Sequence, residues 1–253
     1  MTYDLTPVRG HNTKRTSKRF LNNSSKVNIL IYDTETTGIA PDDRIMQIAI
    51  YNVKTDESYQ QYINPEISMK KKASEITGIT DDFLKNKPIF SKIVNNFEDF
   101  IFKNTKKNDI TLLIAHNNNF DESKLRKEYG FIEKDFIKNI IFVDTLDLFR
   151  MWIHKKDIKF NDHGRPVKGT YKLSTGKFDD PEIIGNDLYQ RFMGHAFENA
   201  HNAITDIIAL WDITKALFRY SFNRDDIQFI TYILVLYTYH SELNDPEYMS
   251  HLL

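Results

Sequence analysis

The sequence predicts an α/β protein in which helices flank a mixed sheet. Three apolar stretches follow one another closely, at 27–35, 44–53 and 57–65. After them, segments with the periodicity of helices and of strands alternate as far as residue 220. A meander followed by such alternation is typical of a mixed sheet covered by helices.

The first three stretches read VNILIYDTE, RIMQIAIYNV and ESYQQYINP. They are rich in Ile, Val and Tyr, which favours strands. The segment FSKIVNNFEDFIFKN, residues 90–104, has apolar residues at helical spacing and predicts a helix.

The second half of the pattern begins with ITLLIA, residues 110–115, which predicts a buried strand. A helix is expected over 119–130, ending at Gly130. NIIFVDT, residues 139–145, predicts the fifth strand, and NAITDIIALWDITKALFRY, residues 202–220, predicts a long helix.

Composition limits the function classes. The chain has 253 residues, is 41% hydrophobic, carries a net charge of −1 and contains no cysteine. Disulfides and thiolate metal sites are therefore excluded, and there is no overall basic field for holding nucleic acid. No apolar run reaches the about 20 residues of a membrane span, and the N-terminus lacks an apolar signal core. We expect an intracellular protein, cytoplasmic or nuclear, and not a secreted one.

One domain is expected over residues 27–220. The locally basic residues 1–26 read as a disordered tail, with nucleic-acid contact or an import signal as alternatives. Residues 155–187 form a polar, glycine-punctuated insertion with several lysines, which fits either a solvated loop or an electropositive lip that guides a strand. Residues 221–253 predict a helical extension.

Two acids end the first predicted strand. Asp33 and Glu35 share one face because side chains alternate along a strand. Burying ionised carboxylates without a positive partner is costly. Oxygen ligands suit Mg²⁺ or Mn²⁺, which would supply the missing positive charge. Gly38 then permits a sharp departure of the chain. A D-x-E pair alone is nevertheless a weak signal.

Two further stretches place acids at helix starts. Asp121 opens the helix after the fourth strand, and Asp206 lies on the early turns of the long helix, with His201 just before it. Each has an ordinary alternative, since an acid can simply complement a helix N-terminus and a lone histidine is usually structural.

The motifs DTETTG, AHNNNFD and HNAITD, in this order, closely resemble the three motifs of the DEDD superfamily of 3′→5′ exonucleases. The H-x-x-x-x-D form of the third resembles the histidine branch, which includes proofreading subunits and RNase T-like enzymes. The resemblance covers about residues 27–220 and implies a ribonuclease H-like fold, with a mixed five-stranded sheet flanked by helices.

The resemblance also implies a site and an activity. Its four metal-binding acids would be Asp33, Glu35, Asp121 and Asp206, and its general base would be His201. Two divalent cations, Mg²⁺ or Mn²⁺, would lie about 3.5–4 Å apart and hold the scissile phosphate. The expected reaction is hydrolysis from the 3′ end of DNA or RNA, with release of nucleoside 5′-monophosphates.

Substrate contacts follow from the same resemblance. Relatives seat the terminal nucleotide, and wedge an apolar side chain beside its base, just after the first motif. The residues around the second motif are expected to contact sugar, phosphate or base, with plain core packing as the alternative for Phe120. The expected contacts are Thr36, Thr37, Ile39, His116, Asn117 and Phe120.

Two other functions fit the motifs. The first is a proofreading subunit that acts with a polymerase, and the second is a non-catalytic nucleic-acid-binding protein that keeps the fold. The expected partners are single-stranded 3′ ends of DNA or RNA, with a polymerase or a second copy of the chain as protein partner, and no membrane.

Overall fold

The computed structural model describes residues 27–103, 105, 109–137, 140–146, 189, 193–194, 201–223, 227–228, 230–231 and 234. The predicted tail over 1–26 and the predicted insertion over 155–187 lie outside these residues, as does most of the predicted C-terminal extension. None of the described helices has the length and apolar character that a membrane crossing requires.

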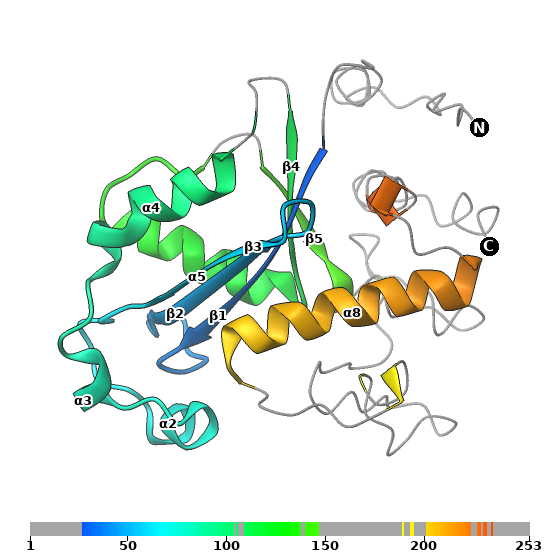
Figure 1. The fold of residues 1–253 in the computed structure, drawn as a ribbon. Coiled ribbons are helices and arrows are strands. Elements are labelled where there is room, and N and C mark those ends of the chain that lie inside the picture. Colours follow the sequence, from blue (N-terminus) through cyan, green and yellow to red (C-terminus); the bar gives the residue numbers. More distant parts are fainter. Residues whose placement is uncertain are drawn as a thin grey trace, which may run out of the picture.

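The described chain builds a five-stranded mixed sheet in the order β3-β2-β1-β4-β5 (Figure 1). Strands β1 and β2 are antiparallel, as are β2 and β3, whereas β4 runs parallel to β1 and to β5. This arrangement confirms the predicted fold class. The strands are β1 (Val27–Thr36), β2 (Ile45–Asn52), β3 (Glu57–Tyr62), β4 (Ile110–Ala115) and β5 (Ile140–Asp144).

Helices cover both faces of the sheet (Figure 1). The long helix α8 packs on the face that carries Ile29 and Ile31, while α4 and α5 pack on the face that carries Leu30 and Tyr32. Strand β1 is therefore buried between two hydrophobic layers. The helices are α2 (Lys71–Thr77), α3 (Asp81–Leu84), α4 (Phe90–Phe102), α5 (Asn118–Phe131) and α8 (Ala203–Phe222).

Two helix ends differ from the prediction. Helix α5 continues through Gly130 to Phe131, and the chain turns at Glu133, which has a left-handed φ of 51°. Helix α8 runs two residues past Tyr220, to Phe222. Asn223 caps it with a left-handed φ of 54° and an N–H bond to the Arg219 carbonyl at 2.8 Å. In α5, Gly130 was predicted as the last residue because Gly is the commonest residue just after a helix, but here it lies inside the last turn.

The short helices α2 and α3 were not predicted as elements. Gly78, in the left-handed region at φ 71°, closes α2 with an N–H bond to the Ser74 carbonyl. The Thr80 side chain caps α3 by accepting a hydrogen bond from the Phe83 N–H at 3.3 Å. A Gly and a Thr two residues apart are an end signal and a start signal that the sequence did contain.

We predict that Phe97→Ala lowers the free energy of unfolding by about 3–5 kcal/mol, the usual cost of truncating a fully buried phenylalanine. Phe97 is completely buried on the inner side of α4, between that helix and the sheet. Phe102 is 36% exposed at the end of the same helix, and Phe102→Ala is the matched control, expected to cost less than about 1 kcal/mol. Urea unfolding measures both, and equal losses would contradict this packing.

Candidate active site

The site lies at the C-terminal end of β1, between the two helical layers. Asp33 and Glu35 continue the face that contacts α8, whereas Thr34 points to the layer of α5. The pairing of β1 with β2 shifts register between Glu35 and Thr36. Irregular pairing of this kind commonly re-aims side chains beside active sites. One strand end therefore presents groups to both layers.

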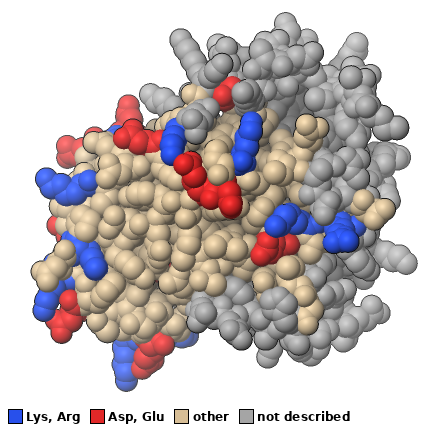
Figure 2. Space-filling view, in the orientation of Figure 1, with Lys and Arg blue, Asp and Glu red and all other residues tan. Residues whose placement is uncertain are grey.

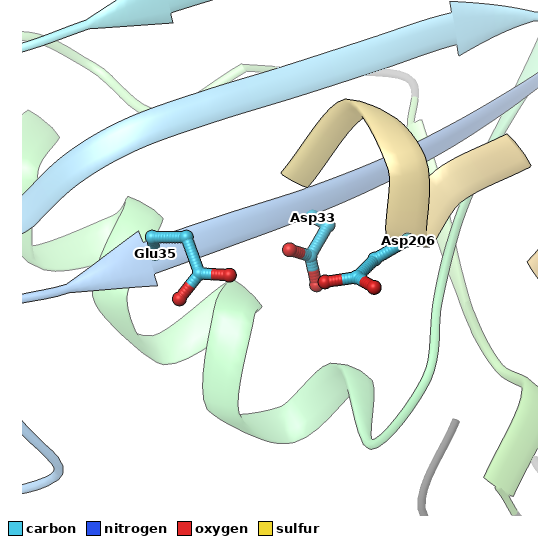
Figure 3. Close-up of side chains that lie close together, drawn as sticks. All are labelled: Asp33, Glu35 and Asp206. Carbon is cyan, nitrogen blue, oxygen red and sulfur yellow. The ribbon is translucent and has the colours of Figure 1, made fainter. Parts of the chain in front are cut away.

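Three carboxylates meet on the α8 side. Oxygen atoms of Asp33, Glu35 and Asp206 all lie within 4.8 Å of one another. Asp206 comes from the first turn of α8, and Figure 3 shows its carboxylate facing that of Asp33, with Glu35 further along β1 and turned to the same space. The acids predicted from the first and third motifs are thus brought together.

Asp121 approaches from the other layer. It lies on the first turn of α5 and is 4% exposed. Its Oδ1 accepts hydrogen bonds from Thr34 N at 3.1 Å and from Thr34 Oγ1 at 2.6 Å. Because Thr34 lies between Asp33 and Glu35, these bonds fix Asp121 beside the three-carboxylate cluster.

The ionised forms of the four acids are disfavoured, mainly by burial. Burial raises the pKa of Glu35 to about 8, and the charges of Asp206 and Asp121 add to the effect. Burial raises the pKa of Asp121 to about 7 and that of Asp206 to about 7, in each case against hydrogen bonds that favour the ionised form. For Asp33, burial followed by the charges of Asp121, Glu35 and Asp206 raises the pKa well above its usual range.

His201 and Asp206 are joined through the backbone. The His201 N–H donates a hydrogen bond to Asp206 Oδ2 at 3.0 Å, and His201 adopts a left-handed φ of 65°. Its side chain is exposed. The turn before α8 therefore holds the predicted base next to one of the predicted metal ligands and open to solvent.

The turn between β4 and α5 is held by the end of β5. Asp144 Oδ1 accepts hydrogen bonds from Asn117 N at 3.0 Å and from Leu146 N at 2.9 Å. The His116 Nδ1 atom lies 3.1 Å from Thr145 Oγ1. Asn117, with φ 61°, is thereby fixed in a left-handed turn just before α5. The sequence predicted this segment only as the end of the fifth strand, and its role in holding the turn before α5 was missed.

The predicted substrate residues occupy different environments. Ile39 is 90% exposed, Asn117 is exposed, and His116 and Phe120 are half-buried. Thr37, by contrast, is fully buried. Within the described structure its hydroxyl bonds inside its own loop, and the Thr36 hydroxyl donates to the Gly38 carbonyl at 2.7 Å.

The residues present fit a divalent cation. The clustered donors are all carboxylate oxygens, the ligand type that hard cations such as Mg²⁺ and Mn²⁺ prefer. Asp206 Oδ1 is buried and has no hydrogen-bond partner in the described part of the chain. The same holds for both polar atoms of the Gln47 amide, on β2 directly opposite Glu35. Buried polar atoms without partners are rare, and a bound ion or water is a usual reason for them.

A sheet of this order, covered on both faces and ending in a cluster of acids, defines a ribonuclease H-like fold with an acidic site. A sequence model of the exonuclease family of the RNase T type matches residues 30–157, half of the chain. The chain therefore belongs to this exonuclease family, which confirms the resemblance to DEDD-superfamily 3′→5′ exonucleases.

Individual relatives agree. The chain is 37% identical over 133 residues to DNA polymerase III subunit epsilon of Rickettsia prowazekii, a match that covers 50% of this chain and 55% of that protein. It is 25% identical over 194 residues to the PolC-type DNA polymerase III of Clostridium perfringens, covering 75% of this chain and 11% of that protein. The chain thus spans about half the length of the epsilon subunits it matches.

Solved structures share the fold. Escherichia coli exonuclease I in complex with a dA16 oligonucleotide superposes with a TM-score of 0.58 at 20% identity, over 82% of this chain and 43% of that one. At this identity the likeness establishes the architecture.

We predict that the metal-free protein loses stability as the pH rises from about 4 to 8. The raised pKa values of Glu35, Asp121 and Asp206 mean that the folded state binds more protons than the unfolded state in this window. Their contribution is therefore complete below the unfolded pKa values of about 4 and is lost as the pH passes the folded values of about 7 to 8.

Melting temperatures in EDTA at pH 5, 6.5 and 8 test this prediction. Asp206→Asn removes one of the repelling carboxylates and should flatten the decline. Asp212→Asn removes an acid of the same helix that pairs with Lys215 at 2.8 Å, and it is the matched control. A slope that is identical in wild type and Asp206→Asn would refute the electrostatic account of the cluster.

Proposed function

We propose that the chain is a metal-dependent 3′→5′ exonuclease that hydrolyses the terminal phosphodiester bond and releases nucleoside 5′-monophosphates. The observation that carries the proposal is the convergence of Asp33, Glu35 and Asp206, from two distant motifs, with Asp121 from a third beside them. Membership of the exonuclease family supports the same reaction.

The cofactor of the proposed reaction is Mg²⁺ or Mn²⁺, with two cations per site. Asp33, Glu35 and Asp206 would hold them, and Asp121 would contribute directly or through water. Such cations lower the pKa of a bound water and stabilise the charge that develops on phosphate oxygens. Cation binding also resolves the carboxylate repulsion, because the ionised form of each acid gains a positive partner.

His201 is proposed as the general base that accepts a proton from the attacking water. Imidazole exchanges protons near neutral pH, which suits this role. The exposed side chain of His201 can return the proton to solvent, and its backbone bond to Asp206 keeps the base beside the acids. The placement is consistent with the histidine branch of the superfamily.

The proposed substrate is a single-stranded 3′ end of DNA or RNA. Ile39 presents an exposed apolar side chain for the terminal base, and Phe120 offers a ring for stacking. Thr36, Thr37, His116 and Asn117 remain predicted contacts to the same nucleotide. Figure 2 shows basic and acidic side chains interspersed with uncharged residues over the face that it draws.

A proofreading role beside a DNA polymerase is the second candidate. It is favoured by the identity with DNA polymerase III subunit epsilon and with PolC-type DNA polymerase III. In this role the chain would act inside the cell on 3′ ends delivered by the polymerase. Activity that rises when a partner polymerase is added would separate this candidate from a free-standing nuclease.

We predict that 5′-labelled single-stranded DNA or RNA, incubated with Mg²⁺ or Mn²⁺, is shortened to a ladder one nucleotide at a time. Asp33→Ala should abolish the ladder because it removes the acid at the centre of the cluster. His201→Ala should slow turnover by about 100- to 10,000-fold, the usual contribution of a general base. EDTA should stop the reaction.

Asp82→Asn is the control for these variants, since Asp82 lies on the surface of α3 and pairs with Lys85. Running the labelled DNA and the labelled RNA in parallel shows which nucleic acid is preferred. A ladder that persists in Asp33→Ala, or in EDTA, would reject the proposed mechanism.

A further inference from the structure

The loop that joins β1 to β2, residues 37–44, combines two properties that seldom occur together. Ile39, within it, is 90% exposed. The rest of the loop is held by an unusual number of buried polar contacts. An ordinary surface loop does not need such buried contacts, so their presence here requires a physical reason.

Asp43 organises the loop from inside. Its buried carboxylate accepts hydrogen bonds from Ala40 N at 2.8 Å and from Thr37 Oγ1 at 3.2 Å. Gly38 makes the close approach feasible, since a Cβ at this position would lie 2.9 Å from Asp43 Cγ and 2.8 Å from Lys70 Cγ. The loop is thus folded tightly around one carboxylate.

Lys124 of α5 binds the backbone of the loop. Its ammonium donates to the carbonyl of Ala40 and, at 3.0 Å, to the carbonyl of Asp43. Only 3% of the residue is exposed. Burial lowers the pKa of the Lys124 ammonium, while the charge of Asp43 opposes this effect. Burying a lysine ammonium costs free energy, and its bonds to two loop carbonyls therefore indicate that the conformation of this loop matters.

Glu128, one turn further along α5, holds the C-terminal end of the loop. Its carboxylate accepts from Arg44 Nε at 2.8 Å, from Arg44 Nη2 at 2.7 Å and from Ile45 N at 3.1 Å. The Arg44 guanidinium also stacks on Phe131, 4.3 Å from its ring centroid. A bidentate pair with a third hydrogen bond fixes both position and orientation.

The same helix face carries a predicted metal ligand. Asp121, Lys124 and Glu128 follow one another at spacings of three and four, which places them in one row along α5. Asp121 is bonded to Thr34 of β1, and Lys124 and Glu128 are bonded to the loop that β1 enters. One rigid helix therefore ties the exposed Ile39 to the acidic cluster.

We propose that Lys124 and Glu128 are positioning residues that fix Ile39 relative to the acids, so that the terminal nucleotide is held with its phosphodiester bond over them. This inference rests on the proposed exonuclease function. An already ordered loop loses no conformational freedom when substrate binds, and small errors of alignment are expensive for catalysis. The two residues contribute to activity through Ile39 and not through the metal site.

A double-mutant cycle tests the proposal on the full chain. Ile39→Ala and Lys124→Met are each expected to lower kcat/KM by about tenfold or more, on the scale of a misplaced substrate. If Lys124 acts through Ile39, the double variant is no slower than the slower single variant. Effects that multiply would overturn the proposal, because two independent sites behave in that way.

Two further readouts separate positioning from general stabilisation. Hydrogen exchange of peptides over residues 37–44 should accelerate in Lys124→Met, whereas Mn²⁺ affinity should remain as in wild type because the Thr34–Asp121 bonds are intact. Unchanged exchange, or lost Mn²⁺ affinity, would overturn the proposal. Lys134→Met, which removes a lysine paired with Glu98 of α4 at 2.8 Å, is the matched control for all readouts.

Lys124→Arg keeps a donor for the loop carbonyls and should restore part of the activity. Lys124→Arg replaces Lys124→Met in the double-mutant cycle if Lys124→Met does not fold. An inactive wild type would reject the proposed function alone, and the cycle would then be scored by anisotropy of a labelled single-stranded DNA with a free 3′ end in Ca²⁺. Additive losses of affinity, or no binding at all, would overturn the inference as well.

Discussion

Repulsion between buried carboxylates is the constraint on which the structure depends. Asp33 and Glu35 follow a stretch of β1, Ile29 to Tyr32, that packs into hydrophobic layers on both faces, and Asp206 and Asp121 approach the strand from opposite helical layers. Burial and the charges of the neighbouring acids together make ionisation of Asp33 and of Glu35 harder. The hydrophobic packing of α8 on Ile29 and Ile31 holds these groups together despite the repulsion, because α8 cannot retreat without exposing its apolar face. A divalent cation converts the same arrangement from unfavourable to favourable.

Hydrogen bonds set the orientation that this packing alone would leave loose. Thr34 aims Asp121, the His201 N–H aims Asp206, and Asp144 fixes the turn that precedes α5. These partners all belong to the same chain as the acids that they orient. Preorganisation of this kind removes the need to reorder ligands during the reaction, which is a large part of what an enzyme supplies. The loop that carries Ile39 follows the same rule.

The sequence was sufficient for the sheet, for three long helices and for the identity of the clustered acids, since periodicity and three ordered motifs carry that information. It was insufficient where partners lie far apart in the chain. Lys124 and Glu128 belong to none of the three motifs, and only folding brings them next to residues about 80 positions earlier in the chain. Thr37 stays a predicted substrate contact, but the sequence did not reveal that its buried hydroxyl bonds within its own loop. Gly130 was misjudged because a residue type alone does not tell a helix interior from a helix end.

The central prediction is that the acidic cluster binds divalent cations. An electron paramagnetic resonance titration with Mn²⁺ measures this binding without any substrate. At pH 8, above the raised pKa values of Asp121 and Asp206, the wild-type chain should remove free Mn²⁺ from solution, and Asp33→Asn should lose most of this binding while keeping the fold by circular dichroism. Equal binding by the two proteins, or none by the folded wild type, would contradict the assignment of the site.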